Sequence, residues 1–245
     1  MLLNLSILYF FTLFSGLLVF ALPSVGQKKF RTLLTFSGAY LFSITVIHIL
    51  PELFHETPNP MWSGIWVLLG FFLQMLLEFF TEGVEHGHMH THGHSPHGTA
   101  TLFLLISLSI HSFLEGTLLV HPTSFHDKDD VRTLMAGMMV HKLPEAFALT
   151  SVLLFQVGNR WKAFLLLALF SLATPAGMFL SDHVLHAGTL PSGFFEVLFP
   201  LVAGNFLYIS TTIFFESGPE HKFKANKVIF SISGAVCALV AEWLI

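Results

Sequence analysis

The chain has 245 residues, of which 53% are hydrophobic and only 11% are charged, and its formal net charge is −4. This composition and the mean hydropathy of +0.72 exclude an ordinary soluble domain and are typical of a protein whose surface faces lipid. A single cysteine, Cys237, excludes a disulfide framework and a four-cysteine zinc site. Fifteen histidines stand out among so few polar residues.

Apolar runs of about twenty residues recur along the chain, and each is long enough to cross a bilayer as a helix. We therefore predict an all-α polytopic membrane protein that forms one transmembrane domain over residues 1–245. No Lys or Arg precedes Lys28, so we expect the first run to be a retained helix and not a cleaved signal peptide. The eight predicted helices cover residues 2–22, 32–54, 61–83, 100–121, 131–155, 160–182, 194–215 and 226–245.

Basic residues are distributed unequally between the two sides of this predicted bundle. With the N-terminus outside, eight Lys and Arg residues lie in inner loops or flanks, and only Lys128 and Arg132 lie on the outer side. This positive-inside bias predicts that both termini are external. It places the His-rich loop at residues 84–99 in the cytoplasm. We separately expect the plasma (inner) membrane as the location.

Two motifs in the middle of the chain place ionisable residues inside apolar helices. His111 and Glu115 are four residues apart, as are His141 and Glu145. Residues at i and i+4 share one face of a helix, so each pair can point toward one place. Ionisable groups at membrane depth are costly and indicate function, and imidazole with carboxylate suits Zn²⁺ and its first-row neighbours. If the two helices run antiparallel, the four side chains lie at one depth and can surround one metal ion.

Other readings of these motifs remain open. The pairs could be buried ion pairs that lock two helices, or part of a proton relay. An intramembrane zinc hydrolase would also place histidines and carboxylates at this depth, although the H-E-x-x-H motif of metalloproteases is absent. A membrane metal sensor that binds without transporting is a third alternative.

The motifs H-S-x-x-E-G at 111–116 and H-K-x-P-E at 141–145 resemble those of the ZIP family of divalent-metal transporters. The eight segments, the external termini and the His-rich loop before the fourth segment agree with that resemblance. It implies movement of Zn²⁺, or of Fe²⁺ and other divalent ions, toward the cytoplasm by elevator-like alternating access. It also implies a homodimer, no enzymatic activity and no cofactor, because the metal is the substrate. We expect no nucleic-acid partner. The family's primary site falls on His111, Glu115, His141 and Glu145.

Some members of that family hold a second metal beside the first. The corresponding positions here are Ser112, Lys142 and Thr174, which are weaker metal ligands or none at all. The resemblance therefore implies a mononuclear site, in which the ammonium of Lys142 stands in place of a second-metal ligand. Alternatively, Lys142 extends away from the site or pairs with an outer acid such as Asp130.

Further groups could serve the ends of the pathway. His48 and Glu52 lie toward the outer end of the second segment and could form an entrance. Glu216, Glu220 and His221 follow the seventh segment and could receive the ion at the inner exit. The cytoplasmic loop has the composition of a tract that binds metal through transient sets of imidazoles, supplied by His86, His88, His90, His92, His94 and His97.

Overall fold

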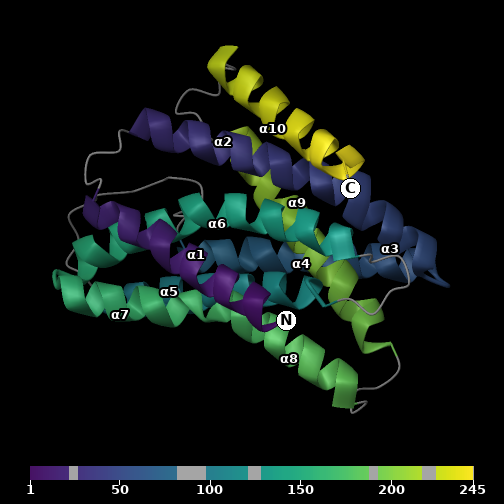
Figure 1. The fold of residues 1–245 in the computed structure, drawn as a ribbon, viewed down its shortest axis with the longest axis horizontal. Coiled ribbons are helices and arrows are strands. Elements are labelled where there is room, and N and C mark those ends of the chain that lie inside the picture. The colour runs from purple at the N-terminus through teal and green to yellow at the C-terminus, as the bar shows by residue number, and fades with distance from the viewer. Residues whose placement is uncertain (22–26, 82–97, 121–127, 188–192, 217–224, 245) are drawn as a thin grey trace.

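The computed structural model describes residues 1–21, 27–81, 98–120, 128–187, 193–216 and 225–244. Over these residues the regular structure is entirely helical. Eight helical stretches among them are long and apolar enough to cross a membrane, which confirms the predicted all-α polytopic fold. The helices lie roughly alongside one another in a bundle (Figure 1). A helix suits a bilayer interior because it satisfies its own backbone hydrogen bonds where no water is present.

Six of the eight spans are single helices, and two are interrupted. The second span contains α2, a π-helical turn η1 and α3, and the sixth contains α7 and α8. The elements are α1 (Leu2–Ala21), α2 (Gln27–Ile44), η1 (Thr45–Ile49), α3 (Leu50–Glu56), α4 (Pro60–Thr81), α5 (Gly98–Leu118), α6 (Lys128–Val157), α7 (Arg160–Ser171), α8 (Ala173–Ala187), α9 (Phe194–Glu216) and α10 (Ala225–Leu244).

Prolines account for both interruptions. Pro175 has no N–H to donate to the carbonyl of Ser171, so the sixth span changes from α7 to α8 at Leu172. Pro51 lies just after η1, in the first turn of α3. The sequence prediction treated both spans as uninterrupted helices. The interruption in the second span places His48 within the π-helical turn.

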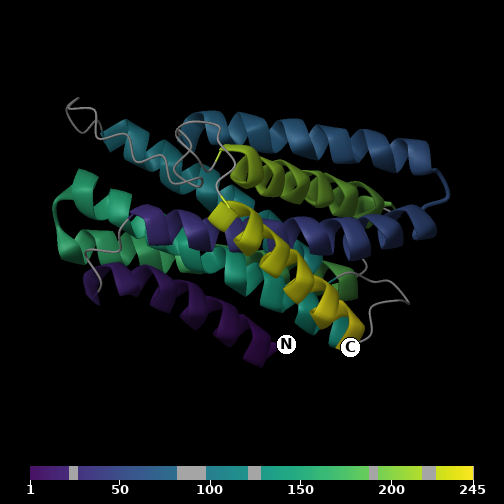
Figure 2. The ribbon, with the colours of Figure 1, turned by 90° about the horizontal axis from the view of Figure 1, so that it is seen from above.

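The helices divide into two groups by packing. In the first group, α5 packs mainly on α8, and α1 packs mainly on α6 with α7 beside it. In the second group, α4 packs mainly on α9, and α10 packs along α2. Figure 1 shows α2 and α10 on one side of α6, and Figure 2 shows α4 and α9 on the side of the bundle away from α1. Fewer contacts join the groups, chiefly between α2 and α6 and between α4 and α5.

Glycines allow the main helix pairs to approach closely. A Cβ at Gly116 would collide with the backbone carbonyl of Thr174, and one at Gly177 would collide with that of Phe113. Gly70 and Gly204 show the same reciprocal relation between α4 and α9. Small residues that bring backbones together are the usual means of packing helices in lipid, where burial of apolar surface between helices drives little association.

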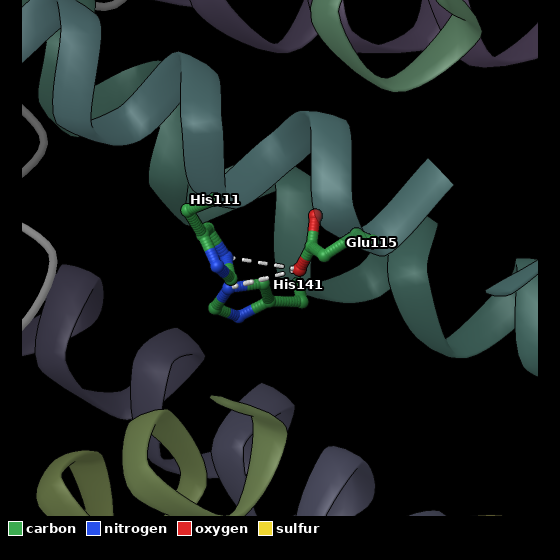
Figure 3. A group of neighbouring side chains, drawn as sticks. All are labelled: His111, Glu115 and His141. Atoms are coloured by element: carbon green, nitrogen blue, oxygen red, sulfur yellow. Dashed lines mark ion pairs between the residues drawn. The ribbon is translucent and has the colours of Figure 1, made fainter. Parts of the chain in front are cut away.

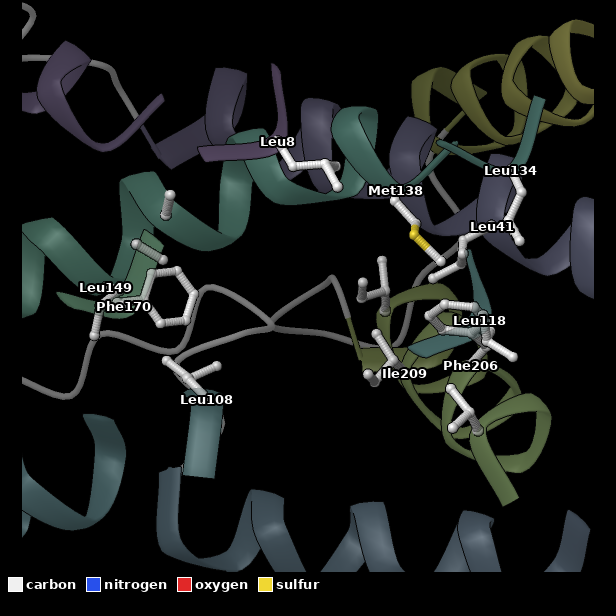
Figure 4. Close-up of a cluster of buried hydrophobic side chains, with 14 of the residues drawn as sticks. Leu8, Leu41, Leu108, Leu118, Leu134, Met138, Leu149, Phe170, Phe206 and Ile209 are labelled. Atoms are coloured by element: carbon white, nitrogen blue, oxygen red, sulfur yellow. The ribbon is translucent and has the colours of Figure 1, made fainter. Parts of the chain in front are cut away.

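The buried apolar side chains form one cluster that extends across both groups. Met138 of α6 and Leu41 of α2 are buried in it, as are Phe206 and Ile209 of α9 (Figure 4). Phe170 and Leu149 lie in another part of the same cluster. The polar centre described next therefore lies in helices whose surroundings are apolar and well packed.

Candidate metal centre

Helices α5 and α6 bring three ionisable side chains together inside the bundle. His111 and Glu115 are both 0% exposed, and His141 is 2% exposed. Figure 3 shows the two imidazoles and the carboxylate converging on one point. Glu115 Oε1 lies 3.0 Å from Nε2 of His111 and 3.9 Å from Nε2 of His141. The two rings meet edge to face, with centroids 5.9 Å apart.

This geometry suits a metal ion. One ligand atom from each of the three residues lies within 4.8 Å of the other two. Zn²⁺ binds histidine nitrogen and carboxylate oxygen at about 2.0–2.2 Å, so small movements would bring all three atoms into its first shell. Neither ring nitrogen of His141 has a hydrogen-bond partner within the described part of the chain. A buried polar atom in that condition needs an explanation, and metal coordination is one.

Glu145, the fourth predicted ligand, lies outside this group of three. One of its oxygens, Oε2, is 2.5 Å from Nζ of Lys142, and the other accepts a hydrogen bond of 3.1 Å from Ser112. Lys142 also donates to Ser112 over 2.7 Å. Lys142, Glu145 and Ser112 thus form a closed triangle of polar contacts beside His111, Glu115 and His141.

Lys142 connects the two parts of the site. It is 1% exposed, and its ammonium forms a close ion pair with Oε2 of Glu115 as well as the pair with Glu145. The ring of Phe170 lies 5.8 Å from the ammonium, which adds a cation–π contact. Its pairing with inner acids replaces the two alternatives considered from the sequence, extension away from the site and pairing with an outer acid. Oε1 of Glu115 faces the histidines while Oε2 faces the ammonium.

Sequence reasoning missed one residue of this centre. Asn205 of α9 is 0% exposed, and its Nδ2 lies 3.4 Å from Nδ1 of His111. A polar amide in the middle of an apolar span was the signal that could have identified it. Thr174, a predicted second-metal position, is buried on α8 at the close contact with Gly116.

The predicted outer residues have a partner that the sequence did not indicate. Nδ1 of His48 lies 2.8 Å from Oε1 of Glu242, near the end of α10, and Nε2 lies 3.7 Å from Oε2 of Glu52. Because the two carboxylates lie against different ring nitrogens, this arrangement is a histidine between two acids. It is not a set of ligands around one point.

Several predicted groups cannot be placed. Glu216 is the last residue of α9, and its side chain is outside the description. Glu220, His221 and the six loop histidines His86, His88, His90, His92, His94 and His97 also lie outside the described residues.

Known proteins share this region of the chain. Residues 82–241 match the model of a family described as ZIP zinc transporters. ZIPCO of Plasmodium falciparum, a protein named for metal ion transport, is 32% identical over 136 residues, which is 54% of this chain and 38% of ZIPCO. Protein zntD of Dictyostelium discoideum is 26% identical over 178 residues, which is 66% of this chain and 25% of zntD. The matches thus span well under half of either relative. The family match extends over more than half of the chain and includes both His–Glu motifs, and the chain therefore belongs to the ZIP family of zinc transporters.

Proposed function

We propose that the chain transports divalent metal, with zinc as its main substrate, through the centre formed by His111, Glu115 and His141. The observation that carries this proposal is the convergence of three buried metal-binding side chains inside membrane-spanning helices. Ionisable groups are expensive at that depth, and they are retained mostly where ions or protons pass. Membership of a family of metal transporters supports the same function.

Each residue has a distinct role in this proposal. Nε2 of His111, Nε2 of His141 and Oε1 of Glu115 bind the ion. Lys142 stands where a second cation would bridge the carboxylates, so the centre holds one metal. Glu145 balances the charge of Lys142. If it left the ammonium of Lys142 and turned to the ion, it would be a fourth ligand. Two imidazoles and one carboxylate also suit Fe²⁺, so iron is the expected competitor.

The packing of the bundle suggests how the ion would cross. The three proposed ligands lie on α5 and α6 of the first helix group, and Asn205, on α9 of the second, contacts one of them, His111. Movement of one group against the other would open the centre to alternate sides, which is alternating access toward the cytoplasm. His48 and Glu52 would lie near the entrance, and Glu216, Glu220 and His221 near the exit. We also propose external termini, a plasma-membrane location and a homodimer.

A zinc hydrolase is the second candidate, because one feature of the centre favours it. Three protein ligands with an open fourth position are typical of catalytic zinc sites. A sensor would bind metal equally well but carry none across. Both alternatives predict binding without flux, whereas a transporter moves metal in a membrane that contains no other protein.

Uptake of radioactive zinc into proteoliposomes tests the proposal. Purified protein should carry zinc, and His111→Ala, Glu115→Ala and His141→Ala should each abolish uptake while the protein stays inserted. His186→Ala is a matched control, because it removes an imidazole that is 74% exposed at the end of α8. Tight binding without uptake by the unmutated protein would favour a sensor or a hydrolase. Normal uptake by any of the three ligand variants would remove that residue from the centre.

A further inference from the structure

Asn205 lies against the metal centre with its amide only partly satisfied. Its Nδ2 is 3.4 Å from Nδ1 of His111. Its Oδ1 is buried and has no hydrogen-bond partner among the residues that the structure describes. An unpaired buried carbonyl oxygen is unfavourable, so we expect the amide oxygen of Asn205 to accept a hydrogen bond in another state of the protein.

The two nitrogens of His111 face different groups. Nε2 points to Glu115, 3.0 Å away, and Nδ1 points to Asn205. A neutral imidazole carries one proton, on one nitrogen or the other. When the proton is on Nε2, beside the Glu115 carboxylate, Nδ1 is an acceptor and needs a donor. When Nε2 binds a metal ion, the proton is on Nδ1, which then needs an acceptor.

An asparagine can serve both states of the ring. Its amide carries a donor at one end and an acceptor at the other, and a 180° rotation exchanges them in nearly the same space. A leucine of similar size could serve neither state, and an aspartate could serve only as an acceptor. The residue type at position 205 therefore matches a histidine whose proton changes place when metal binds.

We infer that Asn205 is a positioning residue for His111, a role that rests on the proposed metal function. When Nδ1 is unprotonated, the amide nitrogen, 3.4 Å away, donates to it. In the loaded centre the amide rotates, and its oxygen accepts the Nδ1 proton, which directs the Nε2 lone pair at the metal. Outer partners of this kind are typical of metal-binding histidines, and their loss weakens metal binding about 10–100-fold.

The contact between Asn205 and His111 crosses from one helix group to the other. Asn205 lies on α9, which packs mainly on α4, whereas His111 lies on α5, which packs mainly on α8. The hydrogen bond therefore joins the two helix groups and depends on their relative position. Metal affinity at His111 is then highest in the arrangement seen here and falls when the groups separate at this point.

Two variants of nearly equal size test the role. In protein that lacks residues 86–97, zinc affinity is measured by competition with a chromophoric chelator. Asn205→Leu should weaken zinc binding about 10–100-fold. Asn205→Asp, which keeps the acceptor, should bind zinc at least as tightly as the parent. Ser210→Ala is the control, because Ser210 is also buried on α9 but bonds only to the backbone of its own helix.

Nitrogen-15 NMR of the His111 ring supplies a readout that a merely structural role would not move. In zinc-loaded parent and Asn205→Asp protein, the Nδ1 proton should be protected from exchange and hydrogen-bonded. In Asn205→Leu protein that protection should be lost. Equal affinity and an unchanged ring spectrum in the leucine variant would overturn the inference, as would an aspartate variant that binds zinc as weakly as the leucine one. Failure of the proposed transport is separate, because it would appear as zinc binding without uptake into proteoliposomes, and neither the affinity nor the ring spectrum of the Asn205 variants depends on uptake.

Discussion

At the scale of single residues, the buried ammonium of Lys142 bears on how many metal ions the proposed centre would hold. Its ammonium pairs with both Glu115 and Glu145 in a fully buried position. One dication beside these groups changes the sum of formal charges from −1 to +1 when the histidines are neutral. A second dication placed about 4 Å from the ammonium would meet a repulsion of about 8 kcal/mol at an effective dielectric of 20. We therefore propose that the centre holds a single metal ion.

Replacing Lys142 should therefore create a second metal site. In protein without residues 86–97, we expect one tightly bound zinc per chain in the parent. We expect two in the Lys142→Asp, Ser112→Asn, Thr174→Glu variant, because a cation is exchanged for ligands. Metal analysis after gel filtration gives the count, and anomalous diffraction from zinc-soaked crystals gives the positions. The Ser112→Asn variant alone keeps Lys142 and should still bind one. Two well-occupied ions in the parent centre would contradict this account of Lys142.

The sequence indicated which side chains of α5 could lie together better than it indicated the residues that contact them. Spacing alone showed that His111 and Glu115 share a helix face, and they lie 3.0 Å apart. It did not show that Glu145 would turn to Lys142, although the two are three residues apart on one helix and such pairs commonly interact. Asn205 and Glu242 belong to other spans, and no spacing rule connects residues so far apart in the chain. Such contacts depend on tertiary packing.

At the scale of helices, α4 and α9 pack with glycine against backbone in both directions. Gly70 of α4 faces the carbonyl of Leu201, and Gly204 of α9 faces that of Val67. A carbonyl held in a helix cannot move as a side chain can. The distance between α4 and α9 therefore depends on the absence of a side chain at these points. Gly64, also on α4, has nothing within 4 Å of the place a Cβ would occupy.

The two glycines of α4 make a matched test of this packing. Gly70→Ala should force α4 from α9 at a cost of about 1–3 kcal/mol, which lowers the apparent Tm by roughly 2–12 °C. Gly64→Ala should leave the Tm unchanged or raise it, because alanine favours the helix and meets no neighbour. Thermal unfolding in detergent, followed by tryptophan fluorescence, measures both. An equal Tm for the two variants would show that the α4–α9 contact can relax around a methyl group.

Hydropathy predicted where the spans lie but not how they are interrupted. Pro51 and Pro175 lie inside apolar runs, and a proline there can kink a helix, change its hydrogen bonding or be tolerated. Pro144 is tolerated, because α6 continues as a helix on both sides of it. The outcome at each proline depends on neighbouring helices, and these cannot be read from one segment.

At the scale of the whole molecule, the grouping of the helices is what the sequence leaves undetermined. Every span is apolar, so hydropathy gives no reason for α5 to choose α8 or for α4 to choose α9. The pairs are selected by matching small residues and by a few polar contacts, both of which appear only when the spans are brought together. The centre lies where one group touches the other, through His111 and Asn205.

The orientation of the molecule in its membrane can be tested through two loops. Eight basic residues on one side predict that this side is cytoplasmic, and an even number of spans leaves the start of α1 and the end of α10 on the other. With the single cysteine removed by Cys237→Ala, we introduce Pro58→Cys between α3 and α4, or Arg160→Cys at the start of α7. Both positions are exposed. A membrane-impermeant maleimide should label position 58 in intact cells and position 160 only after permeabilisation.

The reverse pattern would invert the proposed orientation and, with it, the assignment of His48 and Glu52 to the entrance. Equal labelling of both in intact cells would indicate a mixed topology, for which the positive-inside bias of this chain gives no reason.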